Sequence, residues 1–349
     1  MPYKPFSVTA AGISHTKHGK GCEDFSLHYP SYQDKSRSPV ALCVIADGHG
    51  DENCFRSARG AEFAARTARD AVIEFVNRLS PRLLNIVRLK QWPSKEVFEK
   101  FLHDLVKHII ASWHGKVEDD YRSNPVTDEE LERVDEKHKK KYREGKDIHH
   151  TYGTTLIVAA ITDAYWFGIH LGDGRFTVLY KDGAVDQPVP WDERCFLNVT
   201  SSLCDDDAME RARIYYAPIT EKIPAAVFLC SDGVDDNYPV ADNEKHLYKL
   251  YRIIALTFAE DDFESTCGQL KDLANSLATR GKGDDTSIAG IINMEAVRQV
   301  APLLQKQVDE EKSATDKMIA EETVTVKSLD EQDGPLEYGE FVHKDEKDV

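Results

Sequence analysis

The sequence predicts an α+β protein in which antiparallel sheets are covered by helices. Apolar runs of strand length outnumber the helical segments that could connect parallel strands, which argues against a doubly wound parallel sheet. Several of these runs follow one another after short polar breaks, as antiparallel strands do. Two helical segments separate the early runs from the later ones, and further helices close the chain.

The first part of the chain alternates strand and helix patterns. Residues 6–13 are short, mixed and β-prone, and residues 40–46 form a continuous apolar run that stops at an Asp-Gly pair, as a buried strand does before a turn. The apolar period then becomes helical over residues 53–79 and again over residues 94–113.

The stretch from 117 to 147 is almost entirely polar, and we expect a surface insertion there. Thr127 and Glu130 have the spacing of a capping box, which predicts that a short solvated helix begins at this point. The basic run at 138–143 follows an equally dense acidic run and is typical of one side of a charged helix. An interaction arm is the alternative interpretation of the insertion.

Most of the remaining elements are predicted strands. Three apolar or alternating runs with short breaks predict an antiparallel meander at residues 155–161, 165–170 and 175–180. A buried strand, a helix, a final strand and a closing helix are then predicted at residues 225–230, 262–277, 286–292 and 295–312.

Composition changes near the end of the chain. From residue 309 onward there are 14 acidic and five basic residues, a local charge of −9, and the apolar periodicity fades. We therefore expect one domain over residues 1–300, followed by a helical extension and a flexible acidic tail over residues 301–349.

Charge and cysteine usage limit the classes of function. The 349 residues carry a formal net charge of −17, which disfavours nucleic acid as a partner. No apolar run approaches the roughly 20 residues that span a membrane, and the first residues lack the pattern of a signal peptide. The seven cysteines include no CxxC pair, so neither a disulfide framework nor a zinc site is indicated. We expect a monomer in the reducing cytoplasm, without membrane binding.

Acidic residues lie at the ends of several predicted strands. Because paired strands bring their ends together, these carboxylates can converge, and crowded carboxylates repel one another unless a cation lies among them. Oxygen ligands without cysteine and with few histidines suit Mg²⁺ or Mn²⁺. The acids concerned are Glu23, Asp24, Asp47, Asp173, Asp232, Asp284 and Asp285.

The alternative interpretation is that the Asp-Gly pairs are only turns, because Gly tolerates positive φ and Asp bonds its own backbone. The pair Asp182-Gly183 is of this kind, since its position after the run at 175–180 predicts a hairpin turn. The joint spacing of the pairs at 47–48 and 232–233, and the residues beside them, favour a chemical role for those two.

Six short segments lie beside predicted strands, in the order GCED at 21–24, ADGHG at 46–50, YGTT at 152–155, LGDGR at 171–175, CSDGV at 230–234 and GDDTS at 283–287. Each resembles a motif of the metal-dependent protein serine/threonine phosphatases (the PPM family, protein phosphatase type 2C), and the order is that family's order. The resemblance implies a four-layer αββα sandwich, in which two antiparallel sheets pack face to face with helices on both outer faces.

The resemblance also implies a pair of metal sites that hold Mg²⁺ or Mn²⁺. Asp47 would bridge the two ions and the Gly48 carbonyl would join one of them. Glu23, Asp232 and Asp284 would complete the pair.

Further roles are implied around this pair. Asp24, which would hold metal-bound waters, and Asp285 would lie just behind the ligands, while Asp173 and Asp236 would bind a weaker third ion. A water that bridges the two ions would attack a phosphoserine or phosphothreonine ester of a phosphoprotein directly, and His49 would protonate the leaving oxygen.

The sequence departs from the family at the residue that grips the substrate phosphate. The family usually carries an arginine four residues before Glu23, where this chain has Gly19. Lys20 and His18 are the candidates to bind phosphate instead, although lysine lacks the planar fork of arginine. Two alternatives therefore stay open, namely a pseudophosphatase that acts as a binding scaffold and a phosphatase of small phosphomonoesters. The absence of a P-loop argues against a kinase or GTPase.

Overall fold

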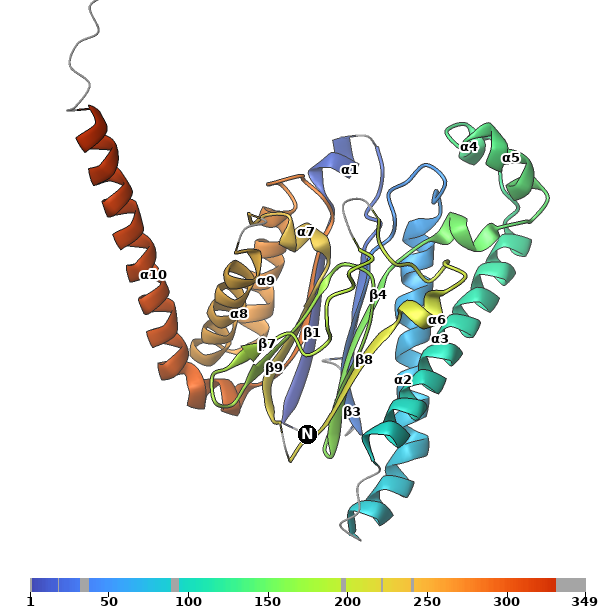
Figure 1. Ribbon diagram of the computed structural model, residues 1–349. Helices are drawn as coiled ribbons and strands as arrows, with labels where there is room; N and C mark the ends of the chain where they lie inside the picture. The colour runs from blue at the N-terminus through green and yellow to red at the C-terminus, as the bar shows by residue number, and fades with distance from the viewer. Residues whose placement is uncertain are drawn as a thin grey trace, which may run out of the picture. The chain divides into compact units, whose positions relative to one another are not determined.

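The computed structural model describes residues 2–17, 19–31, 38–88, 94–195, 199–220, 222–239 and 242–330, including their side chains except at 80–88 and 313–330. The chain divides into two compact units, Met1–Leu304 and Gln305–Val349. In the first unit, two five-stranded sheets pack face to face with helices on both outer faces (Figure 1). The predicted fold class is confirmed.

All neighbouring strands in the two sheets are antiparallel. The first sheet has the order β1-β10-β9-β6-β7 and the second has the order β2-β3-β4-β5-β8. The strands are β1 (Tyr3–Ala10), β2 (Phe25–Tyr29), β3 (Val40–Ala46), β4 (Leu156–Thr162), β5 (Tyr165–Leu171), β6 (Arg175–Tyr180), β7 (Val185–Asp186), β8 (Arg213–Pro218), β9 (Pro224–Cys230) and β10 (Thr286–Asn293).

Helices α2 and α3 cover the second sheet, and α8 and α9 cover the first (Figure 1). None of the helices in the described part of the chain is long and apolar enough to cross a membrane. The helices are α1 (Ile13–Lys17), α2 (Ser57–Arg88), α3 (Lys95–Ser123), α4 (Asp128–Leu131), α5 (Glu136–Arg143), η1 (Ile148–Tyr152), α6 (Ala208–Arg211), α7 (Asp232–Asp235), α8 (Asn243–Glu260), α9 (Phe263–Leu277) and α10 (Met294–Asp330).

Strand β3 shows why a continuous apolar run is needed at the centre of the fold. Successive side chains of a strand point to opposite faces, and both faces of β3 are buried. One set packs toward α2 and α3, namely Val40, Leu42, Val44 and Ala46. The alternate set packs against the facing sheet, namely Ala41, Cys43 and Ile45.

The predicted meander is wrong in its third strand. Strands β4 and β5 pair with each other, but β6 lies in the other sheet between β9 and β7. The chain changes sheets in the turn between β5 and β6, where Gly172 has a φ of 117° that a side chain would strain. This crossing places Asp173 at the end of both sheets. The hairpin turn predicted at Asp182-Gly183 is confirmed, since it connects β6 to β7.

The polar insertion has a small apolar core of its own. The capping box predicted at the start of α4 is present, with Thr127 and Glu130 bonded reciprocally. Leu131 and Tyr142 are buried in a cluster against Phe55, which lies in the loop that precedes α2. Among the strands, the sequence analysis missed β2, β7 and β8, and among the longer helices it missed α8. The end of the predicted tail, 331–349, lies outside the described residues.

Candidate active site

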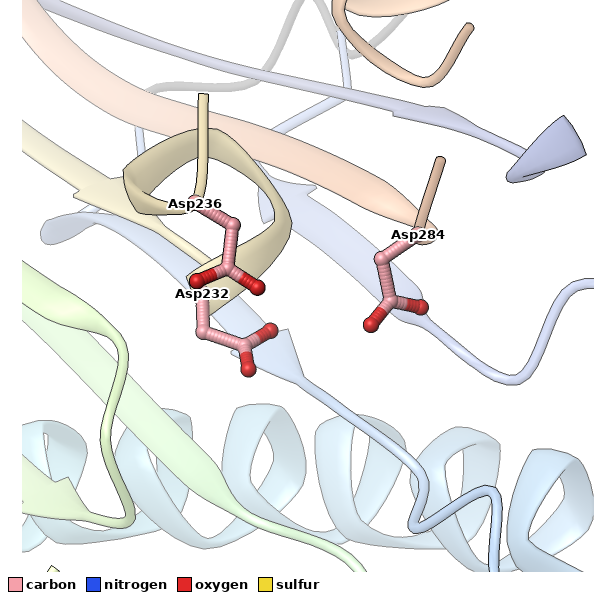
Figure 2. Close-up of side chains that lie close together, drawn as sticks. All are labelled: Asp232, Asp236 and Asp284. Atoms are coloured by element: carbon pink, nitrogen blue, oxygen red, sulfur yellow. The ribbon is translucent and has the colours of Figure 1, made fainter. Parts of the chain in front are cut away.

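The acids of the predicted site come from separate elements that end at the same edge of the two sheets. Asp47 follows β3, Asp173 lies in the β5–β6 turn, and Asp232 begins α7 directly after β9. Asp232, Asp236 and Asp284 form the tightest group, in which one carboxylate oxygen of each lies within 4.8 Å of the other two. Figure 2 shows Asp232, the first residue of α7, beside Asp236, which directly follows this helix, and both face Asp284.

Burial and mutual repulsion disfavour the charged forms of Asp24, Asp47 and Asp232. Burial, followed by the charges of Asp24, Asp232 and Asp173, raises the pKa of Asp47 well above its ordinary value. Burial and the charge of Asp173 raise the pKa of Asp232 to about 8. Burial and a neighbouring carboxylate also raise the pKa of Asp24 to about 7. A cation placed among these carboxylates would reverse the effect.

The residues fit a hard divalent cation. Among the described residues, Glu23 Oε2 and Asp24 Oδ2 are buried without a hydrogen-bond partner. The donor set is made of carboxylate oxygens, which Mg²⁺ and Mn²⁺ prefer. Gly48 is required by close packing, because a Cβ there would lie 2.6 Å from the Glu23 carbonyl oxygen.

Two threonines hold the backbone of Asp47 in place. The Asp47 N–H donates to Thr155 Oγ1 at 3.0 Å, and its carbonyl accepts from Thr154 Oγ1 at 2.9 Å and from the Thr155 N–H at 2.8 Å. Ser57 Oγ donates to Glu23 Oε1 at 2.8 Å, which orients a second candidate ligand. The residues from 152 to 155 therefore position the site without offering it a charge.

Asp285 fastens the segment that carries Glu23. Its carboxylate accepts from the N–H groups of Gly12 at 2.7 Å and Glu23 at 2.6 Å, and it lies 3.0 Å from His15 Nδ1. Burial raises its pKa, but the hydrogen bonds from His15, Gly12 and Glu23 outweigh burial and lower it overall. Its negative charge is thus compensated by this segment.

His15 is a site residue that the sequence analysis missed. Its ring lies 3.8 Å from Glu23, 3.4 Å from Asp284 and 3.0 Å from Asp285. The hydrogen bond to Asp285 raises its pKa despite burial. No motif pointed to it, because α1 brings it to the site from a position eight residues before Glu23.

The family model for protein phosphatase 2C matches residues 11–276, which is most of the chain. This chain belongs to the protein phosphatase 2C family. The predicted family is therefore confirmed, and it is a family of protein serine/threonine phosphatases. A search of curated protein sequences found no significant match.

Solved structures of similar fold include other phosphatases. The catalytic domain of the serine/threonine phosphatase PstP, in complex with two manganese ions, is 16% identical over 83% of this chain and 97% of its own, with a TM-score of 0.46. Stp1 from Staphylococcus aureus is 14% identical over 83% and 94%, with a TM-score of 0.46. A C. elegans sex determining protein is 17% identical over 85% and 67%, with a TM-score of 0.48.

At the position where the protein phosphatase 2C family usually carries an arginine that binds the substrate phosphate, this chain has Gly19. Gly19 has a φ of 71° and no atom within 4 Å of where a Cβ would lie. Lys20 Nζ donates to the Gly50 carbonyl at 2.9 Å, and its charge acts on Glu23. It therefore lies at the rim of the site. His18, the other predicted phosphate ligand, lies outside the described residues.

His49 lies in the same loop as Asp47 and is held by Gly153, the residue after η1. Its backbone N–H donates to the Gly153 carbonyl at 3.1 Å. Burial, followed by the charge of His150, lowers the pKa of His49 to about 4 although Asp51 acts in the opposite direction. The ring is therefore uncharged near neutral pH before substrate binds.

Proposed function

We propose that this chain hydrolyses phosphoserine and phosphothreonine esters of proteins with Mg²⁺ or Mn²⁺ as its cofactor. The main support is the cluster of crowded carboxylates at the end of the two sheets, with raised pKa values at Asp47 and Asp232. Such repulsion is what a divalent cation relieves. The manganese ions of PstP agree with this choice of metal.

Two divalent cations would be held by Asp47, Glu23, Asp232, Asp284 and the Gly48 carbonyl. Bound there, they would supply an activated water and offset the charge of the transferring phosphoryl group.

The chain's own residues have further roles in the proposal. Asp173 and Asp236 would bind a weaker third ion. Asp24 would lie behind these ligands and hold metal-bound waters.

Substrate binding and proton transfer fall to side chains at the rim. Lys20 would attract the phosphate as a point charge. His49 would protonate the leaving serine or threonine oxygen. Its ring is neutral in the free protein, and the charge of a phosphate dianion beside it would raise its pKa toward the working range.

The test is hydrolysis of a phosphothreonine peptide by metal-stripped protein that is titrated with Mn²⁺ and then with Mg²⁺. We expect activity only with metal, and we expect Asp47→Asn to abolish turnover while circular dichroism shows an intact fold. Near-normal activity of Asp47→Asn would exclude the proposed site. A location in the cytoplasm and a monomeric state remain predictions.

A scaffold function is the second candidate, and Gly19 is the observation that favours it. Without the arginine fork, the site has less to hold a phosphate dianion. Metal binding by calorimetry without cleavage of any phosphoester would support this alternative. Cleavage of small phosphomonoesters but not of phosphopeptides would instead support a phosphatase of small molecules.

A further inference from the structure

A cavity of about 480 Å³ is lined by residues of β5, β6 and the start of α8. His170, near the end of β5, and Arg175, at the start of β6, both line it. These two residues flank the turn that carries Asp173. The cavity is also lined by Asp242 and Glu244 at the start of α8.

His170 is buried in the wall of this cavity with unused hydrogen-bonding capacity. Its exposed fraction is 3%, and neither ring nitrogen has a hydrogen-bond partner of good geometry among the described residues, although the backbone of Gly174 is close. Burial, followed by the charges of Arg213 and Arg175, lowers its pKa well below the ordinary value. A neutral ring offers one nitrogen as an acceptor to a ligand.

The charge of Arg175 is already compensated. Its Nε donates to Asp235 Oδ2 at 3.0 Å, and its guanidinium lies 4.1 Å from the centre of the Trp191 ring. It therefore contributes little net positive charge to a ligand. Asp242 and Glu244 are exposed, so the charged side chains that line the cavity carry a negative surplus.

Acceptor groups in the cavity remain available to a donor. Glu244 accepts from Gln187 Nε2 at 3.1 Å and from the Tyr248 hydroxyl, and both contacts use its Oε1. The Oδ1 of Asn243 is buried without a partner among the described residues. A ligand with several N–H donors and a positive charge would satisfy both groups together with His170.

We propose that this cavity is a subsite for a basic side chain, arginine or lysine, of the phosphoprotein substrate. The proposal rests on the proposed function. Arg175 is two residues from Asp173, and Asp235, its partner, is next to Asp236. Because an extended peptide advances about 3.3–3.6 Å per residue, the basic residue lies within a few positions of the phosphorylated one.

The test is a set of phosphothreonine peptides in which one arginine moves from position −4 to +4 on a neutral background. At the preferred position, arginine is replaced by citrulline, which keeps the shape and removes the charge. We expect kcat/KM for arginine to exceed that for citrulline about fivefold, as for a partly exposed ion pair. Glu244→Gln should reduce the preference toward one, whereas Asp272→Asn, an exposed acid on α9, should keep it.

A preference that survives in Glu244→Gln, the absence of any preferred position, or a preference for glutamate would overturn the subsite. Hydrolysis of p-nitrophenyl phosphate should be equal in all variants, since it has no basic side chain. If the metal-loaded protein cleaves no phosphoester, the proposed function fails. The cavity is then tested by fluorescence anisotropy of the arginine and citrulline peptides, and equal affinities would refute it.

Discussion

Replacement of Asp232 by asparagine should change how the stability of the metal-free protein depends on pH. In the folded chain the pKa of Asp232 is raised to about 8 by burial and by Asp173, whereas in the unfolded chain it is about 3.9. Between these values the folded state holds a proton that the unfolded state has lost. The contribution of Asp232 to stability is therefore complete below pH 4 and is lost as pH rises toward 8.

The size of the effect follows from proton linkage. One extra proton on the folded state lowers the free energy of unfolding by about 1.4 kcal/mol per pH unit. From pH 5 to pH 7 this amounts to at most about 3 kcal/mol, since Asp232 shares its environment with Asp47 and is partly exposed. Asparagine is neutral in both states, so the variant should gain this amount relative to the unmodified protein.

The comparison of two proteins removes the contributions of titrating groups that do not interact with Asp232, such as the two histidines. The pKa of His49 is lowered to about 4, so its contribution to stability rises between pH 4 and 6.5, opposite to that of Asp232. His15 has a raised pKa and acts in the same direction as Asp232. Both contributions are common to the two proteins and cancel in the difference.

The assay is urea unfolding with a chelator present at pH 5, 6, 7 and 8. The difference in unfolding free energy between Asp232→Asn and the unmodified protein should grow with pH, and the same difference for Asp272→Asn should stay constant. Saturating Mg²⁺ should reverse the order at pH 8, because only the unmodified protein retains the full ligand set. A difference that does not change with pH would refute the repulsion inferred among these carboxylates.

Three further predictions concern the leaving group, the packing of α2 and the absence of an arginine at Gly19. His49→Gln should lower kcat for a phosphothreonine peptide at least about 100-fold but change p-nitrophenyl phosphate hydrolysis little, because nitrophenolate leaves without a proton; equal losses would exclude His49 as the acid. Gly60→Ala should cost about 1–3 kcal/mol in urea unfolding, because its Cβ would lie 1.8 Å from the Tyr152 carbonyl oxygen. Gly115→Ala on α3, where the space is open, should instead stabilise by about 0.5–1 kcal/mol. Gly19→Arg should lower KM about tenfold through charge-assisted hydrogen bonds, whereas Gly19→Ala, with the same strain, should not; equal KM values would show that phosphate does not bind there.

The sequence was sufficient to predict the layers of the fold, because the central strands are buried on both faces. Runs such as residues 40–46 have no polar position, so their location in a central sheet follows from composition alone. The transfer of β6 to the other sheet was not predictable in this way. It depends on the turn around Asp173, whose direction is set by backbone angles rather than by apolar period.

The candidate site was predictable where the side chain itself carries the chemistry. Asp47, Asp232 and Asp284 are acids beside strands, and the structure brings them to one edge. His15 was not predictable, because a five-residue helix sets its position and the fold is needed to know which acids it meets. The sequence also did not reveal that Gly12 and Glu23 stabilise the negative charge of Asp285, because both residues contribute backbone N–H groups rather than side chains.

Some residues of the motif segments carry a charge into the site, and others hold the backbone of those residues. This distinction affects how the replacement of the family's arginine by Gly19 is interpreted. Asp47 and Asp232 present charge to the site, whereas Thr154, Thr155 and Asp285 only hold backbone that carries a charge. Both kinds are present here, with Asp285 where the family usually has an asparagine. We therefore expect metal binding and substrate binding to be separable in this chain. The carboxylates and their supports predict ordinary affinity for divalent cations, while Gly19 in place of an arginine predicts weak affinity for the phosphate. Substrate selection must then depend more on contacts with parts of the substrate other than the phosphate. The cavity lined by His170 and Arg175 would supply such contacts.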